Sequence, residues 1–372
     1  MKIKDKQFEL DPYEECPCGS EKKFKFCCFE KARSAQKISE PHSHNYTDGR
    51  LKNMLMNFWE DTDFRDCFIS DDQCKGEIKS AHSIQNNRIL NRISEDGHVY
   101  TIEATINHSE IEPEFKKMSR NKASTFFGFC DYHDTEVFKP IELVPFQNTP
   151  EQHFLLAYRG FCVAYHKVIR KMNTIRNSAK QFPESLLNPV TVNMYRVAQL
   201  DMKDDKIEFN NFTDDLRNKN YSCLETFSYT LNHEVNFAVS SCFAISEDMN
   251  SKPLQDIHDL NEDVLIPRAL VNIFPIEGKT VIILSYYKIF EEIYGILFEQ
   301  LRNSTEHNLL HYLSYIIFNG TEDVYYRLSS IESLDSKTKK SMIESYTSYL
   351  NPFHEIDLLY SDLHFNFNLF EL

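Results

Sequence analysis

Residues 16–28 read CPCGSEKKFKFCC, and this stretch decides how the N-terminal part of the chain folds. Its four cysteines, Cys16, Cys18, Cys27 and Cys28, have the spacing C-x-C-x8-C-C. Four thiolates at this spacing can close a tetrahedron around one zinc ion, and Gly19 permits the backbone turn that follows the first pair. A closed site of four cysteines has no open position for water, so its predicted role is structural. So short a segment has no core of its own, and zinc would supply much of its folding free energy.

These residues resemble the SEC-C motif, a zinc-binding motif first known from the tail of the bacterial secretion ATPase. In that family the module is an accessory contact for protein partners or for the ribosome. The resemblance therefore implies a bacterial origin and a docking role. It implies no activity, because the module is attached to many different proteins.

Composition indicates a globular protein. The chain has 372 residues, of which 41% are hydrophobic and 26% charged, enough for two or three compact units. The N-terminal residues have no apolar segment typical of a signal peptide, and no apolar run is long enough to span a membrane. We therefore expect a cytoplasmic protein without a membrane partner. In such a chain, clustered cysteines with histidines nearby indicate zinc rather than disulfides.

The formal net charge of −15 argues against a protein coated for non-specific nucleic-acid binding. Two local stretches, residues 22–37 and 159–180, each carry six basic residues, against one acid in the first and none in the second. A solvated helix face is the plain interpretation of both. As candidates for nucleic-acid contact they offer Lys22, Lys23, Lys25, Arg170, Lys171 and Arg176.

The chain divides into four predicted regions. Residues 1–40 hold the cysteine motif and a short basic helix, and residues 41–50 form a polar linker. Residues 51–148 hold a second Cys/His cluster, and residues 149–372 form a larger α+β domain. The fold class predicted for the whole chain is α+β, and its sequence does not indicate an oligomeric state.

The region from residue 149 begins with a helix signal. Thr149-Pro150-Glu151-Gln152 combines an N-cap, a first-turn proline and a capping-box glutamine. The apolar period that follows predicts one long amphipathic helix, with Arg159 and the other basic residues on its polar side. Later segments predict strands at 226–244, a hairpin around Glu277-Gly278 within 269–287, and helices at 289–301, 308–318 and 336–350. A Gly-rich phosphate loop and a nucleophile elbow are both missing from this region, so its function is not readable from sequence.

The second cluster has the pattern Cys67-x6-Cys74-x7-His82, followed by Cys130-x2-His133. Two ligand pairs separated by a strand-rich insert are the pattern of a treble clef. Three interpretations stay open. Zinc takes Cys67, Cys74, Cys130 and His133 and leaves His82 free, or His82 replaces Cys67 as the fourth ligand. Alternatively, no metal binds and the residues form a thiol-rich core.

The layout from Cys67 to Phe138 resembles the core of an HNH-type nuclease. The resemblance implies that His82 is a general base and that Asp134 binds a catalytic divalent ion, Mg²⁺ or Mn²⁺. Asn86 or Asn87 would stand for the family's middle Asn. Two positions depart from the family: Ala81 replaces an acid, and Phe138 replaces the final polar residue.

Other candidate site residues have weaker support from the sequence. His98, ahead of a predicted strand, is a further catalytic candidate, although a lone histidine there is more often structural. His42 and His44 have H-x-H spacing within the linker. The isolated cysteines Cys162, Cys223 and Cys242 are predicted to be buried thiols.

Two hypotheses for function follow. In the first, an HNH-like zinc protein cleaves or binds nucleic acid by metal-assisted phosphodiester hydrolysis, in anti-phage defence. In the second, a non-catalytic adaptor uses two structural zinc sites and binds a protein partner through its SEC-C module or its C-terminal domain. Ala81 and Phe138 favour the adaptor, whereas a free His82 and the basic stretches favour the nuclease.

Overall fold

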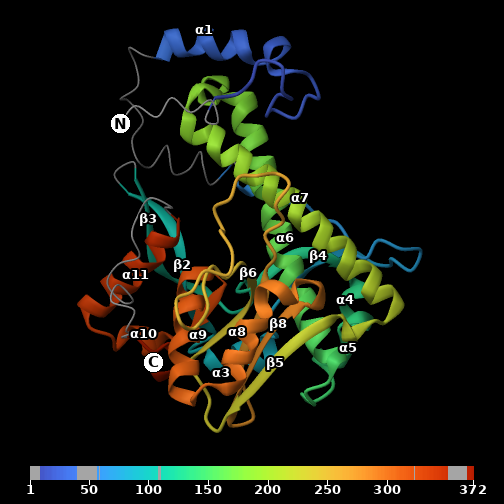
Figure 1. Cartoon of the computed structure of the whole chain (residues 1–372), viewed down its shortest axis with the longest axis vertical. Helices are drawn as coiled ribbons and strands as arrows, with labels where there is room; N and C mark the ends of the chain where they lie inside the picture. Colours follow the sequence, from blue (N-terminus) through green and yellow to red (C-terminus); the bar gives the residue numbers. More distant parts are fainter. Residues whose placement is uncertain (1–8, 40–56, 58, 108–109, 322, 351–366) are drawn as a thin grey trace.

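The computed structural model describes residues 9–39, 57, 59–107, 110–321, 323–350 and 367–372. The molecule is elongated, with the N-terminal helix α1 (Phe29–Ser39) at one end and a large sheet toward the other (Figure 1). The predicted linker 41–50, with His42 and His44, lies outside the described residues. Within the described part of the chain, no helix is long and apolar enough to cross a membrane.

The described strands form one large antiparallel sheet and one small one. The large sheet has seven strands in the order β3-β2-β9-β6-β7-β8-β5. In chain order, the strands are β2 (His98–Asn107), β3 (Glu110–Ser119), β5 (Leu224–Leu231), β6 (Phe237–Phe243), β7 (Ala269–Ile276), β8 (Lys279–Tyr287) and β9 (Val324–Tyr326). Strands β7 and β8 form the predicted hairpin: Glu277 and Gly278 have φ angles of +50° and +80°, as a two-residue type I′ turn requires.

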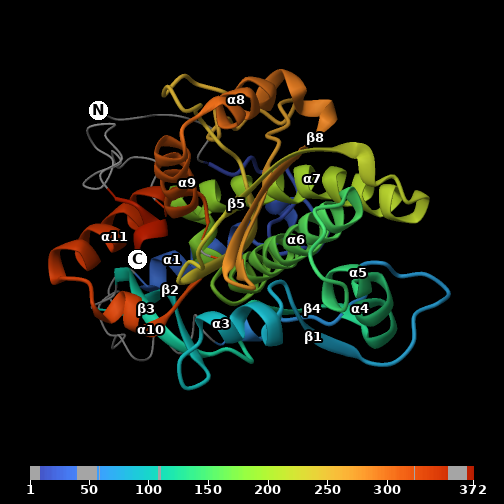
Figure 2. The same cartoon turned by 90° about the horizontal axis from the view of Figure 1, so that it is seen from below.

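The large sheet is covered on both faces (Figure 2). Along β7, Ala269, Val271 and Ile273 pack into one core while Leu270 and Phe274 pack into another. This alternation follows from the two-residue period of a strand. The first core contains α8 (Glu291–Asn303), α9 (Glu306–Gly320), α10 (Leu328–Glu332) and α11 (Ser336–Leu350), and the second contains α6 (Pro150–Gln181) and α7 (Pro189–Asn218). The fold is therefore α+β, as predicted.

Helix α6 begins as the sequence predicts. Thr149 is its N-cap and accepts a hydrogen bond from the backbone N–H of Gln152, with Pro150 in the first turn. The Gln152 side chain does not complete a capping box. Its Oε1 accepts from the N–H of Gln147, and its Nε2 donates to the backbone oxygens of Pro140 in α5 and Pro145 in the loop that follows. The glutamine thus ties that loop to the helix.

A small two-stranded sheet stands beside α6. Strand β1 (Ile78–His82) pairs with β4 (Thr125–Cys130), with a bulge between Lys79 and Ala81. After β1 come the single-turn helices η3 (Asn86–Leu90) and α3 (Asn91–Ile93), and after β4 come α4 (Asp131–Val137) and α5 (Lys139–Glu142). The β2–β3 hairpin lies between them in sequence and pairs with β9 at Tyr100 and Tyr326. One sheet therefore contains strands from both sides of the boundary predicted at residue 149.

The N-terminal module packs onto the helical end of the molecule. Its short helix η2 (Phe24–Phe26) and α1 follow the cysteine turn, and α1 lies against η4 (Pro183–Leu187). Phe24 shares a core with Met172 and Ile175 of α6 and Tyr195 of α7. The cysteine cluster of this module is therefore continuous with the hydrophobic core that joins α6 and α7.

Candidate metal centres

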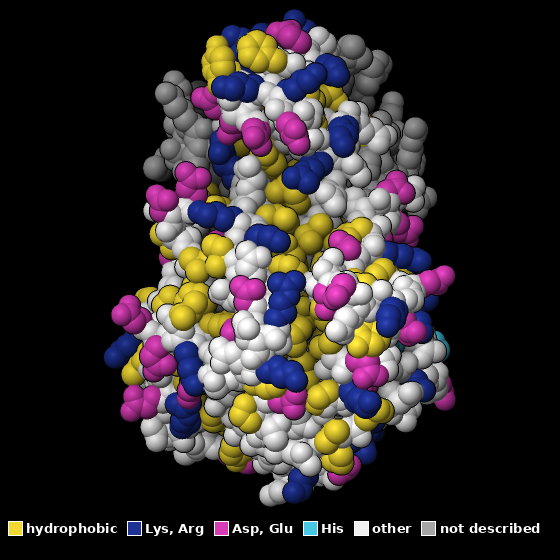
Figure 3. Space-filling view, turned by 90° about the vertical axis from the view of Figure 1, so that its right-hand side faces the viewer, with side chains coloured by type: hydrophobic (Ala, Val, Ile, Leu, Met, Phe, Trp, Pro, Cys, Tyr) yellow, Lys and Arg dark blue, Asp and Glu magenta, His cyan; other side chains and the backbone are white. Residues whose placement is uncertain are grey.

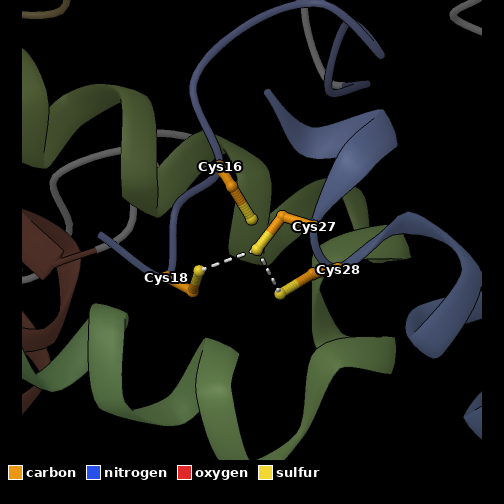
Figure 4. A group of neighbouring side chains, drawn as sticks. All are labelled: Cys16, Cys18, Cys27 and Cys28. Atoms are coloured by element: carbon orange, nitrogen blue, oxygen red, sulfur yellow. Dashed lines mark hydrogen bonds between the residues drawn. The ribbon is translucent and has the colours of Figure 1, made fainter. Parts of the chain in front are cut away.

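The four N-terminal cysteines converge on one point (Figure 4). Their sulfur atoms all lie within 4.8 Å of one another. The Sγ of Cys27 lies 3.5 Å from that of Cys18 and 3.8 Å from that of Cys28. Gly19, with φ of +74°, makes the turn after the first pair. This group could hold one metal ion, as the spacing predicts.

The thiols of this cluster compete for protons. Burial raises the pKa of Cys16 to about 11 and raises that of Cys28 further. At Cys18, burial is outweighed by hydrogen bonds from Ser20, Cys16 and Cys27, which lower the pKa to about 7. One thiolate is thus stabilised at the expense of its neighbours. A divalent cation is the partner that would let all four ionise together.

The second cluster brings together Cys67, Cys74, Cys130 and His133, whose ligand atoms also lie within 4.8 Å of one another. The Nδ1 atom of His133 lies 3.3 Å from the Sγ atoms of Cys67 and Cys130 and 3.6 Å from that of Cys74. This is the ligand set of the first interpretation. A tetrahedral site of three cysteines and one histidine suits zinc.

Backbone hydrogen bonds hold the two ligand pairs in place. The N–H of Phe68, next to Cys67, donates to Gly128 O at 2.9 Å, and Asp131 N donates to Glu77 O at 3.0 Å. Cys130 is the N-cap of α4, and His133 lies in its first turn. A loop with two cysteines, a two-stranded antiparallel sheet and a helix with two candidate ligands at its start form the arrangement expected of a treble clef.

An outer partner of this cluster was not predicted from the sequence. The Nε2 atom of His133 lies 3.1 Å from Asp71 Oδ1, while the other ring nitrogen faces the sulfur atoms. A carboxylate that binds the far nitrogen of a metal-ligating histidine fixes the ring orientation and raises its basicity. Asp71 lies between Cys67 and Cys74 in the sequence. A prediction that considers only Cys and His as ligands does not include it.

His82 lies outside this group of ligand atoms. It ends β1, and its Nδ1 lies 3.0 Å from the backbone oxygen of Ala123. A carbonyl oxygen only accepts, so Nδ1 carries the proton and Nε2 has a free lone pair. Burial lowers the pKa of His82, which keeps the ring neutral at pH 7.

Asp134, expected to bind a catalytic cation, instead binds a guanidinium group. Its Oδ1 lies 3.1 Å from Nη2 of Arg159, and Nη1 of the same arginine contacts Oε1 of Glu142. Arg159 is 3% exposed and lies 4.4 Å above the ring of Phe138. Its predicted place on a solvated helix face is therefore wrong, because two acids from α4 and α5 compensate its charge inside the fold.

Asn86 and His98 make hydrogen bonds to partners other than His82 and Asp134. Asn86 Nδ2 donates to Asn121 Oδ1 at 2.9 Å, and His98 Nδ1 lies 2.7 Å from the backbone oxygen of Asp96. No hydrogen bond or ion pair joins either residue to His82 or Asp134 in the part of the chain that the structure describes. Their catalytic roles stay predictions.

The basic candidates on α6 contact other parts of the protein. Arg170 donates to Trp59 O at 2.7 Å and stacks on the Trp59 ring, and Lys171 pairs with Asp201 at 3.0 Å. Arg176 packs beside Gly19 of the N-terminal module. By contrast, the side chains of the module itself, Lys22, Lys23 and Lys25, are exposed.

Cys162 and Cys242 are buried, Cys223 is partly buried, and none of the three joins either candidate metal cluster among the described residues.

Comparison with known protein families, curated proteins and solved structures found no match. The resemblances to the SEC-C motif and to HNH nucleases therefore stay predictions, and the function has to be inferred from the sites alone.

Proposed function

We propose that the protein is a non-catalytic adaptor, in which two structural zinc ions stabilise the fold and the N-terminal module binds a protein partner. The observation that carries this proposal is the buried Arg159, whose guanidinium bridges Asp134 and Glu142. Hydrolysis would need carboxylates near His82 to bind a divalent ion, and Asp134 is the carboxylate to which the HNH resemblance gives that role. An arginine stays protonated at any working pH, so the two acids already have a permanent cation.

A catalytic divalent ion would have to displace that guanidinium. Arg159 is packed against Phe138 and is 3% exposed, so displacing it would cost that packing and both ion pairs. Phe138 also occupies the place of the last polar residue in the HNH pattern and offers no ligand. Both features favour a treble clef that keeps its structural metal and has lost hydrolysis.

The N-terminal module offers a docking surface. Tyr13 is 54% exposed and Phe26 68% exposed, and Lys25 Nζ lies 4.9 Å above the Tyr13 ring. Figure 3 shows basic and hydrophobic side chains at this end of the molecule, with acidic side chains among them. Exposed aromatic rings beside lysines suit an acidic segment that also carries apolar side chains, because such a partner gains both burial and charge pairing.

Fluorescence anisotropy with a labelled acidic peptide, rich in Glu and Leu, tests this surface on the full chain. The double variant Phe26→Ser with Lys25→Glu should weaken binding at least several-fold. Ile289→Ser is the matched control, because Ile289 is 69% exposed but belongs to the turn before α8. Equal binding by wild type and the double variant would contradict the assignment of this surface.

The nuclease remains a second candidate because of His82. Its proton is fixed on Nδ1 by Ala123 O, and its neutral ring leaves Nε2 able to accept a proton from water. Metal-assisted hydrolysis of DNA or RNA, as in anti-phage defence, would use this base with Mg²⁺ or Mn²⁺. This second candidate function requires that the wild-type protein cleaves nucleic acid and that the His82→Ala variant does not.

A further inference from the structure

A pocket opens beside Arg159. It is lined by residues of η3, α5, the start of α6 and the buried strands β6 and β7, among them Gln85, Val144, Arg159, Ser240, Asn272 and Phe274. It is a hollow of about 490 Å³ that includes space open to solvent. Small-molecule sites are concave and mostly apolar, with a few polar groups that orient the ligand, and this lining has that composition.

Polar groups without partners line this pocket. Ser240 is 1% exposed and its Oγ has no hydrogen-bond partner among the described residues, and the same holds for Nε of Arg159. Asn272, at 2% exposed, adds a buried amide from β7. Leaving a buried donor unsatisfied costs its full desolvation penalty, so two such groups at one pocket point to something that binds them.

From these groups we propose that the pocket binds a compact, uncharged ligand: a single-ring compound that carries a carbonyl oxygen. The Nε–H of Arg159 is a donor only, and the Ser240 hydroxyl can donate as well. The ligand must therefore supply an acceptor. Neighbouring apolar side chains, such as Leu156, Phe274 and Ile276, would pack against its ring.

Local charge favours a neutral ligand over an anion. The guanidinium of Arg159 is already paired with two carboxylates, Asp134 and Glu142. The second arginine at the pocket, Arg88, donates to the backbone oxygens of Glu142 and Val144. A carboxylate or phosphate placed here would lose its hydration and meet the negative charge of Glu142, so it would gain little net attraction.

Two neighbouring serines on β6 give a matched pair of variants. Ser240→Ala removes the unpartnered hydroxyl, so it should leave the melting temperature unchanged or raise it while it weakens ligand binding. Ser241 Oγ accepts from Thr321 Oγ1 at 2.7 Å, and Ser241 is 4% exposed. Ser241→Ala should therefore lower the melting temperature and leave binding unchanged.

The experiment is ligand-detected NMR on the full, zinc-loaded chain, with benzamide as the probe and benzoate as its charged analogue. Benzamide should bind, benzoate should bind more weakly, and Ser240→Ala should reduce benzamide affinity by roughly ten-fold at most, the value of one hydrogen bond. Val144→Trp, which adds bulk at the rim, should reduce it further, while Leu143→Trp, at a neighbouring exposed position outside the pocket lining, should not.

Absence of benzamide binding, or equal affinities for benzamide and benzoate, would overturn the proposal. So would binding that persists unchanged in both Ser240→Ala and Val144→Trp, because the probe would then sit elsewhere. The result is independent of the adaptor function, since the acidic-peptide assay reports on the N-terminal module, which packs against the other end of α6.

Discussion

Arg159 Nη2 lies 3.1 Å from Asp134 Oδ1. This contact joins α6 to α4, the helix that carries His133 of the second candidate metal site, and the same guanidinium also contacts Glu142 of α5. It places a fixed positive charge beside the residue that the HNH resemblance assigns to a catalytic metal ion. The proposed adaptor function with structural zinc depends on this contact.

Metal analysis of the purified chain should give two zinc ions per molecule. Cys18→Ser and Cys130→Ser should each remove one of them, because each takes a ligand from a different cluster. Cys162→Ser, a buried cysteine in neither cluster, serves as the control and should keep both. A wild-type content of one zinc would mean that one cluster is only a thiol-rich core.

His82→Ala and His133→Ala should behave differently, although both remove a histidine from the same small domain. His133 lies among the three sulfur atoms, so its loss should release one zinc and lower the melting temperature by several degrees. His82 lies outside the ligand group, so its loss should leave the zinc content at two. Loss of zinc from His82→Ala would restore the interpretation in which His82 is a ligand.

Replacing Arg159 should uncover a cation site. Arg159→Met leaves Asp134 and Glu142 without their counter-charge and should destabilise the protein by roughly 3 kcal/mol. The triple variant that adds Asp134→Asn and Glu142→Gln should recover much of that loss, because no unpaired charge remains. Electron paramagnetic resonance of Mn²⁺ should detect binding to Arg159→Met but not to wild type, where the guanidinium fills the place. Binding of equal affinity in both would show that Arg159 does not exclude the ion.

A buried carboxylate on α7 makes stability depend on pH. Burial raises the pKa of Asp205 to about 7 despite its contact with Arg268, and its Oδ2 has no partner among the described residues. Between the ordinary value of 3.8 and 7, the folded state holds a proton that the unfolded chain has lost. Stability should therefore fall as pH rises through this window.

Denaturant titrations at several pH values test this dependence. Asp205→Asn should reduce the fall in the free energy of unfolding between pH 5 and 8. It should also stabilise the protein at pH 8, because it removes a buried carboxylate while Arg268 keeps an acidic partner, Glu208, at 3.0 Å. Asp214→Asn, an exposed acid on the same helix, should change neither. A profile of Asp205→Asn that runs parallel to wild type would assign the pH dependence to other groups.

The sequence predicts what local spacing determines. The C-x-C-x8-C-C spacing predicts the first group of candidate metal ligands, because a cation constrains residue type and distance together. The Cys130-x2-His133 pair predicts half of the second group, but the spacing alone does not choose between Cys67 and His82. Thr149-Pro150 marks the start of α6, and Glu277-Gly278 marks the β7–β8 hairpin, since each depends on a few adjacent residues.

What the sequence does not predict depends on partners far away in the chain. Helix α7 is not predicted from the sequence, because its buried face carries Asp205 and Glu208, which interrupt the apolar period. Among the described residues, Arg268 of a later segment compensates their charge. The burial of Arg159 likewise requires Asp134, 25 residues earlier. Strand β9 has three residues, too few for a periodic pattern, yet it joins the β2–β3 hairpin to the rest of the sheet.

The most direct test of the adaptor function is single-turnover cleavage by the zinc-loaded wild-type protein in Mn²⁺. Labelled single- and double-stranded DNA and RNA are incubated with excess protein, with His82→Ala as the reference. We expect no cleavage above the reference for any substrate, because Arg159 holds Asp134 and Glu142 and Phe138 offers no ligand. Cleavage by wild type that disappears in His82→Ala would contradict the adaptor function and would establish His82 as the general base of a nuclease.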